Sequence, residues 1–584
     1  MKIKLEIIES SLAIWRILPR YAKRQFLILI GFIAIATLLE ALGLGMIIPF
    51  LGALIPSGLS GSSSGSDLIS RMLEWFAGYS LQVIVLGLLF LFVLKNSYLA
   101  FLAYFQAKFV FKLEADLSKQ LLANYLGRPY SFFVERNSAQ LIRNLVGEIS
   151  NFCHNALTPL CGLIAELLVA LGILTLLIAV NPYGALIMAA ALGMLGGLFH
   201  WRMRRHVGRW GQERQFHEGK RLQKLQESFG ALKEIKIGGL QSQFCSDYAR
   251  HAEGCASTGR RLYTVQSLPR LLLEVLAVLA LVLAVLLVQD TQRTAIVPIL
   301  GLYAAAAFRL MPSANRILNA LQAIRFATPS IDLLSREFAA VPEPIQFSKN
   351  SSLSFESLIA LRNVSFRYSA QNPPVFESVN LEIEKGEVVC LVGSSGAGKS
   401  TLVDVLCGLL SPSSGQVLVD GQKIEGKEYL WHKHIAYVPQ SIFLVDGTIK
   451  ENIALGVAKT EIDEHRLIEV VNICGLEEMV RAHPDGLEAM VGERGARVSG
   501  GQRQRIGLAR EIYRSRDVLV LDEATNALDA STEAEVVANI SRAKSKMTII
   551  WITHGTTPLR FADKLITVQA GGVKVERLGK KETH

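Results

Sequence analysis

Long apolar stretches alternate with basic stretches through the first half of this 584-residue chain. A helix needs about 20 apolar residues to cross the hydrocarbon core of a bilayer, where it satisfies its own backbone hydrogen bonds. Half of the residues are hydrophobic and the mean hydropathy is +0.32, which is unusual for a soluble protein. We predict six membrane spans, at 26–54, 80–104, 152–180, 183–200, 267–288 and 295–316.

The basic residues predict how these spans are oriented. The formal net charge is +10, and Lys and Arg gather before the first span, between spans two and three, and between spans four and five. The short loops in between hold almost none. Because cytoplasmic loops collect Lys and Arg, both ends and the two long loops are expected in the cytoplasm. This explanation of the charge is favoured over nucleic-acid binding, so no nucleic-acid partner is expected.

The two long cytoplasmic loops show helical periodicity, at Phe111–Leu126 and Arg221–Ile237. We expect the membrane helices to continue below the bilayer, with contact points for a cytoplasmic domain near Pro129–Leu141 and Gly238–Phe244. The first outer loop is Gly/Ser-rich and leads into 67–76. That segment is predicted either as an interfacial amphipathic helix or as the start of the second span.

The composition changes after a polar linker at 326–355, which contains Pro342 and Pro344. Beyond it, runs such as Val388–Val392 and Val518–Leu521 predict buried strands. We expect a multidomain protein, with an all-α six-helix transmembrane domain at 1–325 and a soluble α/β domain at 356–584.

A phosphate-binding motif, G-x-x-x-x-G-K-S, follows the strand at Val388–Val392 and precedes a helical run from Thr401. Glycines let backbone N–H groups surround phosphate oxygens, and the helix N-terminus adds a positive dipole. Lys399 is predicted to neutralise phosphate charge, and Ser400 to bind Mg²⁺. The predicted ATP-binding residues of this loop are Gly393, Ser394, Ser395, Gly396, Ala397, Gly398, Lys399, Ser400 and Thr401.

Two carboxylates end the apolar strand that begins at Val518. A buried parallel strand delivers them to the edge of the sheet. Asp522 is predicted to hold Mg²⁺ through water, and Glu523 to polarise the attacking water. ATP and Mg²⁺ are therefore the expected cofactors of a P-loop ATPase domain.

The chain resembles the ATP-binding cassette (ABC) transporter family across roughly 358–575. The resemblance implies that Tyr368 stacks on adenine, that Gln440 links Mg²⁺ and water to the membrane domain, and that His554 contacts the γ-phosphate. The implied catalytic set is Glu523, His554 and Gln440, and the implied metal set is Ser400, Gln440 and Asp522. In chain order, the motifs beyond the P-loop and the strand carboxylates are Tyr368, Gln440, Val491–Gly495, Ser499–Gln502, Ala527–Asp529 and His554.

The segment Ser499, Gly500, Gly501 and Gln502 resembles the family signature, with Val498 where Leu is usual. It begins a predicted helix and so makes a second anion site. In this family that site caps the γ-phosphate bound by the partner's P-loop. One P-loop and one signature in each chain imply a homodimer. Other departures, Asn526 and Gly555, remove no catalytic group.

The order of domains and the long cytoplasmic helices resemble the type IV exporter fold of half-transporters. A narrower resemblance, to bacterial lipid-linked oligosaccharide flippases, lies at Phe308–Ile317, Leu39–Glu40, Ile48–Phe50 and Leu268–Arg270. It implies a polyprenyl-pyrophosphate-type substrate that is moved across the bacterial cytoplasmic membrane.

Four cations inside or near the spans are the candidate substrate residues: Lys95, Arg270, Arg309 and Arg316. Intramembrane cations are costly and usually face a cavity or a partner, so they can form a belt for a pyrophosphate head group. The alternative is snorkelling and local pairing, for example of Arg270 with Glu274 at i,i+4.

The predicted function is ATP-driven export or flipping of a lipid-linked oligosaccharide. The alternative transporter function is the export of peptides or amphipathic drugs. A soluble ABC ATPase acting on DNA has no use for six spans. An ATP-gated channel is disfavoured because Glu523 predicts turnover.

Overall fold

The computed structural model describes residues 11–45, 81–180, 182–287, 293–340, 353–369, 371–525, 530–542, 547–569 and 571–578. The chain divides into two compact units. One consists of Met1–Arg128 and Phe133–Ile345, and the other of Pro129–Phe132 and Gln346–His584. Each unit is described by itself.

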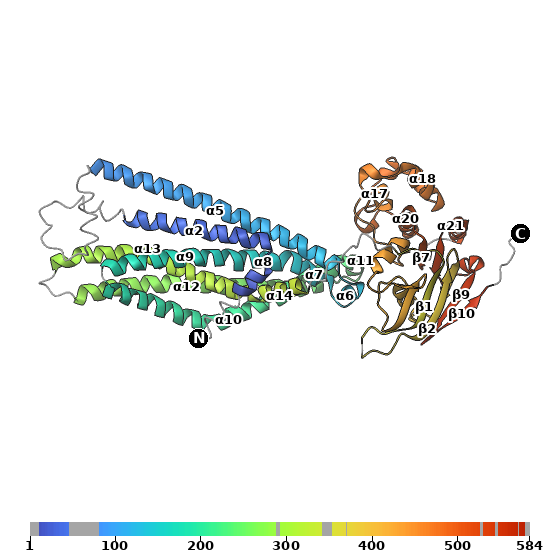
Figure 1. Cartoon of the computed structure of the whole chain (residues 1–584), viewed down its shortest axis with the longest axis horizontal. Helices are drawn as coiled ribbons and strands as arrows, with labels where there is room; N and C mark the ends of the chain where they lie inside the picture. The colour runs from blue at the N-terminus through green and yellow to red at the C-terminus, as the bar shows by residue number, and fades with distance from the viewer. Residues whose placement is uncertain are drawn as a thin grey trace. The chain divides into compact units, whose positions relative to one another are not determined.

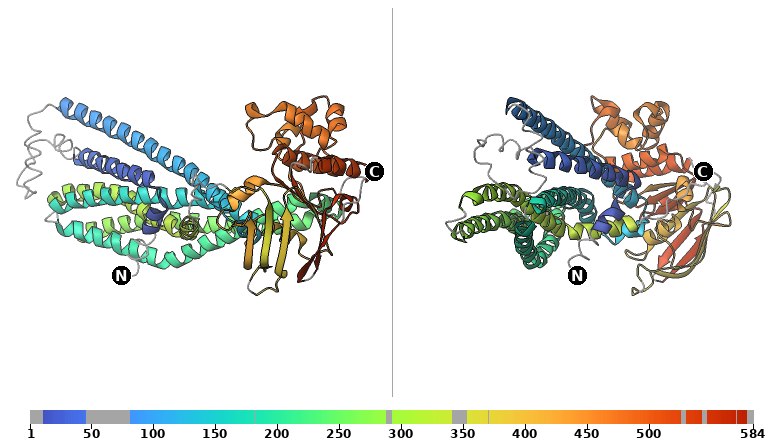
Figure 2. Two further views of the ribbon diagram at one scale, coloured as in Figure 1. Left: turned by 45° about the vertical axis from the view of Figure 1, so that its right-hand side comes forward. Right: turned by 60° about the vertical axis from the view of Figure 1, so that its left-hand side comes forward.

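Long helices that run side by side build the first unit (Figures 1 and 2). Apolar side chains dominate most of them, which suits helices that lie in hydrocarbon. In the described ranges, the helices longer than 20 residues are α2 (Arg20–Gly45), α5 (Leu81–Leu126), α9 (Thr158–Val180), α10 (Pro182–Gly230), α12 (Gln241–Leu287) and α13 (Arg293–Phe326). The shorter elements are α7 (Ser138–Arg143), η1 (Asn144–Glu148), α8 (Ile149–Phe152), η2 (Cys153–Leu157), α11 (Leu232–Ile237) and α14 (Thr328–Ala339). Helix α6 (Tyr130–Val134) is divided between the two units.

Three helical segments of the described residues are long and apolar enough to cross a membrane, at Arg20–Glu40, Val85–Leu126 and Ser138–Thr175. The predicted spans at 183–200, 267–288 and 295–316 fall largely within α10, α12 and α13. The end of the first predicted span, 46–54, and the segment 67–76 lie outside the described residues.

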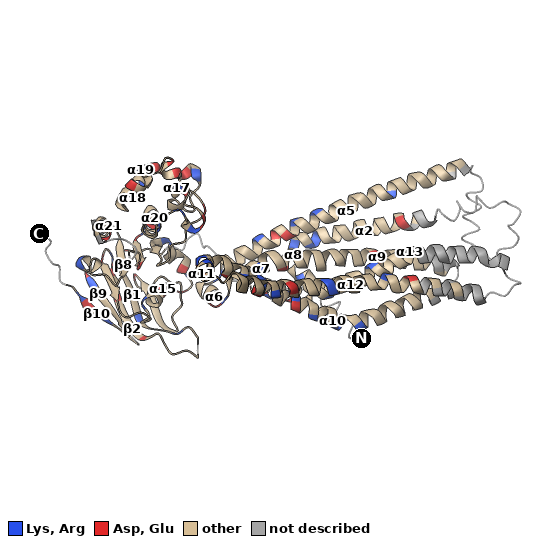
Figure 3. Ribbon diagram, turned by 180° about the vertical axis from the view of Figure 1, so that it is seen from behind, with Lys and Arg blue, Asp and Glu red and all other residues tan. Residues whose placement is uncertain are grey.

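Several helices are much longer than a bilayer requires. Helices α5, α10 and α12 have 46, 49 and 47 residues, against about 20 for a span. Figure 3 shows that their charged residues gather along the portions nearest α7 and α11. Charged residues thus concentrate on the parts of these helices that the sequence predicts to lie below the bilayer.

Helix α14 occupies part of the segment that was expected to be a polar linker. Its Ile331 and Leu334 are buried in the helical unit. Ser330 donates a hydrogen bond to the fully buried Glu148 carboxylate, and Glu337 pairs with Arg136 at 2.8 Å. The helix has a proline in its first turn and buries one face, and the polar residues of that face find partners on other elements. Those partners are what local sequence does not reveal.

Among its described residues, two sheets and a set of short helices build the second unit. An antiparallel sheet has the order β2-β1-β4-β5, and a six-stranded sheet has the order β10-β9-β3-β8-β7-β6. The strands are β1 (Leu358–Phe366), β2 (Phe376–Glu384), β3 (Val388–Val392), β4 (Ser414–Val419), β5 (Gln422–Lys423), β6 (Ile435–Val438), β7 (Val518–Asp522), β8 (Thr548–Ile552), β9 (Lys564–Gln569) and β10 (Gly572–Arg577). The α-helices are α15 (Lys399–Leu406), α16 (Glu428–Trp431), α17 (Ile449–Ile453), α18 (Glu464–Ile473), α19 (Glu477–Ala482), α20 (Gly500–Tyr513) and α21 (Ala530–Arg542).

The six-stranded sheet positions the predicted chemistry. Strands β9, β3, β8, β7 and β6 are parallel neighbours. Their carboxyl ends therefore meet at one edge, where ligands of open α/β sheets bind. The predicted strands at Val388 and Val518 are confirmed, and both are almost wholly buried.

Candidate functional site

The P-loop connects β3 to α15 and contains two glycines, Gly393 and Gly398, that no other residue could replace without a collision. Gly393 has φ of 156° and Gly398 has φ of 97°. A Cβ on Gly393 would lie 2.3 Å from the Val568 carbonyl oxygen, and one on Gly398 would lie 2.6 Å from Val375 Cγ1. The backbone therefore approaches its neighbours closely and keeps its N–H groups clear of side chains, as phosphate binding requires.

Lys399 is buried and folds back over its own loop. Its Nζ donates to the carbonyl oxygens of Gly393 at 2.9 Å and of Ser394 at 3.1 Å. These neutral acceptors satisfy a buried ammonium group. A phosphate anion is a stronger partner for the same group.

Ser400, Asp522 and Tyr437 bring oxygen atoms together at the edge of the sheet. Ser400 Oγ lies 3.4 Å from Asp522 Oδ1, and the Tyr437 hydroxyl donates to Asp522 Oδ2 at 3.1 Å. Burial, and then the charge of Glu523, raise the pKa of Asp522, although hydrogen bonds from Tyr437 and Ser400 oppose this. Burial and the charge of Asp522 raise the pKa of Asp404 to about 6. Such crowded carboxylates favour a divalent cation.

Hydroxyl and carboxylate oxygens are the ligands that Mg²⁺ prefers, so Ser400 and Asp522 fit the predicted metal. Gln440 is the third predicted Mg²⁺ ligand, but in the structure its side chain contacts a different group. Its Nε2 donates to Glu523 Oε2 at 2.7 Å.

Glu523 gathers the predicted catalytic residues. Its second oxygen, Oε1, lies 3.2 Å from His554 Nε2. Its backbone has φ of 51°, which is uncommon for a residue other than glycine and turns the side chain at the end of β7. Positive φ at a functional position is a form of stored strain. The structure thus brings Glu523, Gln440 and His554 together, although they lie far apart in the sequence.

Tyr368 and Ser499 are two further residues that are predicted to contact the nucleotide. The Tyr368 side chain is 46% exposed, and its hydroxyl lies 2.9 Å from Thr401 Oγ1 beside the P-loop. Ser499 is the N-cap of α20, and Ser499 and Gln502 form a capping box. The predicted helix start is confirmed. Two glycines follow at once, so the first turn of α20 is bare of side chains there.

Tyr437 was missed by the sequence reasoning, although it contacts the predicted metal ligand Asp522. Its place on an apolar strand, three residues before Gln440, does not by itself predict this contact. The predicted loop at Ala527–Asp529 and the residue Asn526 lie outside the described residues.

The predicted substrate cations have different surroundings. Arg270 Nε donates to Glu274 at 3.0 Å, so the expected local pair is present. Arg316 pairs with Glu166 at 2.7 Å and is 53% exposed. Lys95 lies over the Phe92 ring at 4.6 Å. The side chain of Arg309 lies outside the described residues, so the structure shows no belt that joins all four.

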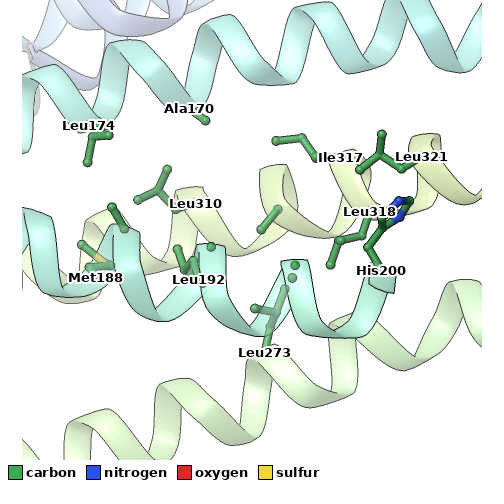
Figure 4. Close-up of a pocket in the computed structure, with 15 residues that line it drawn as sticks. Ala170, Leu174, Met188, Leu192, His200, Leu273, Leu310, Ile317, Leu318 and Leu321 are labelled. Carbon is green, nitrogen blue, oxygen red and sulfur yellow. The ribbon is translucent and has the colours of Figure 1, made fainter. Parts of the chain in front are cut away.

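A cavity of about 380 Å³ lies between α9, α10, α12 and α13. Figure 4 shows apolar side chains around it and His200 at one end. A methyl group on Gly193 or Gly197, which line it, would meet no atom within 4 Å. The cavity is therefore open at these glycines. Its lining is almost wholly apolar.

Comparisons with known proteins support the same family. Residues 376–526 match the family model described as ABC transporter. Residues 27–299 match the family model described as ABC transporter transmembrane region. An ATP-dependent lipid A-core flippase of Cupriavidus metallidurans is 29% identical over 78% of this chain and 77% of that protein. Another from Nitrosococcus oceani is 26% identical over 85% of this chain and 83% of that protein.

Two further matches cover different parts of the chain. A sophorolipid transporter of Starmerella bombicola is 37% identical over 46% of this chain and 20% of that protein. The solved structure of a bacterial Atm1-family ABC exporter with ATP bound has a TM-score of 0.77 at 18% identity, covering 94% of this chain and 95% of that one. The chain therefore belongs to the ABC transporter family: it has the ABC exporter fold, with a helical transmembrane domain and an ATPase domain that drives transport.

Proposed function

We propose that this transporter flips a lipid with an anionic, pyrophosphate-linked oligosaccharide head group across the bacterial cytoplasmic membrane. The observation that carries the lipid class is the match, over membrane and ATPase parts alike, to proteins named lipid A-core flippases. The resemblance at Phe308–Ile317 supports the oligosaccharide. The domain boundaries 1–325, 326–355 and 356–584 belong to the same proposal.

In this proposal two chains form a homodimer with two composite ATP sites. Each P-loop holds the phosphates with Lys399, and Ser400 and Asp522 hold Mg²⁺, which supplies charge neutralisation at the phosphates. Ser499 and the glycines of α20 from the partner chain complete each site. The order of motifs in one chain supports this arrangement, because one signature serves one P-loop.

Glu523 is the proposed catalytic base, with Gln440 and His554 as its positioning partners. In this structure both carboxylate oxygens of Glu523 are engaged, by Gln440 and by His554. Each carboxylate oxygen keeps a second lone pair, so Glu523 can accept a proton from the attacking water while Gln440 and His554 hold it in position. Gln440, which the family places in contact with the membrane domain, thereby links the catalytic base to that domain.

The anionic head group is supported by cations that remain accessible. Arg316 keeps 53% exposure and Arg270 keeps 74% exposure, although each has a carboxylate partner. Exposed guanidinium groups in a membrane-spanning segment favour a phosphate-bearing ligand. Peptides or amphipathic drugs are the second candidate, favoured by the apolar cavity between α9, α10, α12 and α13.

The test is head-group translocation in proteoliposomes, with a fluorescent pyrophosphate-linked oligosaccharide lipid and, in parallel, an amphipathic dye without phosphate. Glu523→Gln is expected to abolish ATP-dependent movement of the lipid. Arg316→Gln is expected to weaken movement without loss of ATPase activity. Glu166→Gln is the matched control, since it breaks the same ion pair but keeps the cation.

Different results separate the two candidates. Movement of the dye but not of the lipid would refute the lipid-linked substrate and favour the drug exporter. Equal losses in Arg316→Gln and Glu166→Gln would show that the ion pair matters only for the fold.

A further inference from the structure

A second cavity of the helical unit, of about 520 Å³, lies between α10, the end of α13 and the start of α14. Three arginines and one aspartate line it, so the lining has a net charge of two positive charges. The charged lining residues are Arg205, Arg209, Arg325 and Asp332. This composition is opposite to that of the apolar cavity, and none of these residues belongs to the proposed ATP site or to the proposed substrate cations.

The arginines of α10 are available for a ligand. Arg205 and Arg209 are exposed, and neither makes an ion pair or side-chain hydrogen bond with another described residue. They are four residues apart, so they lie on one face of the helix. Their charges repel each other, and an anion between them would relieve this repulsion.

The third arginine is held in place by a glycine. A Cβ on Gly208 would lie 3.1 Å from Arg325 Nε, so the guanidinium of Arg325 lies against the bare backbone of α10. One turn further, a Cβ on Gly211 would lie 2.3 Å from the Phe326 carbonyl oxygen. The crossing of α10 and α13 is therefore tight, and it fixes the arginines of the two helices relative to each other.

The cavity begins about one helical turn beyond the apolar part of α10. Trp201, which is 55% exposed, ends the apolar part of α10, and exposed tryptophans mark membrane interfaces. At 1.5 Å per residue, Arg205 lies about 6 Å and Arg209 about 12 Å beyond it along the helix. Both are on the cytoplasmic side, where basic pockets between helices bind lipid head groups.

We infer that the cavity of Arg205, Arg209 and Arg325 binds the phosphate of an anionic lipid from the inner leaflet. Asp332 lowers the net charge of the lining to two positive charges, which one or two phosphodiester groups can balance in part or in full. The site does not rest on the proposed substrate, because a resident lipid of the membrane can occupy it whether or not the transporter moves lipids. It joins α10 to α14, so the bound lipid would bridge these two helices.

The experiment measures binding of tail-labelled fluorescent phosphatidylglycerol to the full-length protein in detergent, with tail-labelled phosphatidylcholine as the zwitterionic probe. The test variant is Arg205→Gln with Arg209→Gln. The matched control is Arg250→Gln with Arg260→Gln, which removes two charges from α12 outside the cavity. Because charge-assisted hydrogen bonds to phosphate are lost, the test variant should bind phosphatidylglycerol at least about tenfold more weakly, and the control should bind like the wild type.

Three results would overturn the inference. One is equal binding of phosphatidylglycerol by the test variant and the wild type, and another is equal binding of the two labelled lipids by the wild type. The third is displacement of the labelled lipid by millimolar inorganic phosphate, which would assign the arginines to a soluble anion. Melting temperatures of both variants close to that of the wild type show that the fold is intact, as expected for exposed residues.

Discussion

Arg214 Nη2 lies 2.9 Å from Glu148 Oε2, and the Glu148 side chain is fully buried. Glu148 belongs to the π-helical turn η1, and Ser330 of α14 donates to the same carboxylate. π-Helical turns are rare and recur at functional positions. This contact ties α14, which follows the last long helix, to two other elements of the helical unit.

Arg214→Ala should destabilise the protein. The buried Glu148 carboxylate would lose the nearer of its two cations but keep Arg143 at 3.6 Å, so the loss should stay below the about 3–5 kcal/mol of a buried charge left unpaired. Thermal unfolding in detergent should show a clearly lower melting temperature. Arg214→Lys keeps the charge and should lose less. Equal melting temperatures of Arg214→Ala and Arg214→Lys would contradict a stabilising role for the ion pair between Arg214 and Glu148.

Gly393→Ala should abolish ATP binding. Its Cβ would lie 2.3 Å from the Val568 carbonyl oxygen, so β9 or the P-loop would have to move. Gly396→Ala is the matched control, because Gly396 also has positive φ, 79°, but a Cβ there meets nothing within 4 Å. That control carries only backbone strain of about 1 kcal/mol, a loss of about tenfold at most. Titration with a fluorescent ATP analogue measures both, and comparable losses would argue against the collision.

Ser499→Ala should reduce ATPase activity far more than Thr448→Ala. Both residues are N-caps of capping boxes, on α20 and α17 respectively. Loss of either cap should cost about 1 kcal/mol of stability. Only Ser499 is proposed to contact nucleotide across the homodimer. Steady-state ATPase rates and melting temperatures of the two variants separate the nucleotide contact from the capping role. Equal losses of ATPase activity in the two variants would show that Ser499 acts only as a helix cap.

Asp420→Asn should lower stability at neutral pH but not in strong acid. Burial raises the pKa of Asp420, but hydrogen bonds from the Ser357 hydroxyl and from backbone N–H groups outweigh it and lower the pKa to about 2. An unfolded aspartate has a pKa of about 3.9. The ionised group thus stabilises the fold above about pH 4, and the contribution is lost as the pH falls toward 2.

The measurement is the difference in melting temperature between wild type and Asp420→Asn from pH 7 to pH 3. The difference should be constant down to about pH 4 and then shrink. A difference that grows on acidification would contradict the assigned direction of the pKa shift.

The ATPase motifs could be predicted because each is contiguous. The P-loop and the strand that ends at Asp522 carry their chemistry in a few consecutive residues, and the structure places them as expected. The contact of Tyr437 with Asp522 could not be predicted, since it spans 85 residues and depends on two strands being neighbours.

The helical unit shows the same limit. Periodicity predicted the long helices. It did not predict that Ser330 would contact Glu148, 182 residues away, or that part of the expected linker would be helical. The local pair of Arg270 with Glu274 was predictable, because helix geometry alone brings such residues together. The partner of Arg316 was not, because Glu166 lies on another helix.

Lys399 is anchored to its own loop. Its ammonium group donates two of its three N–H bonds to the carbonyl oxygens of Gly393 and Ser394. The third N–H stays available for a phosphate oxygen, so the P-loop backbone itself fixes the position of the positive charge that a phosphate would meet.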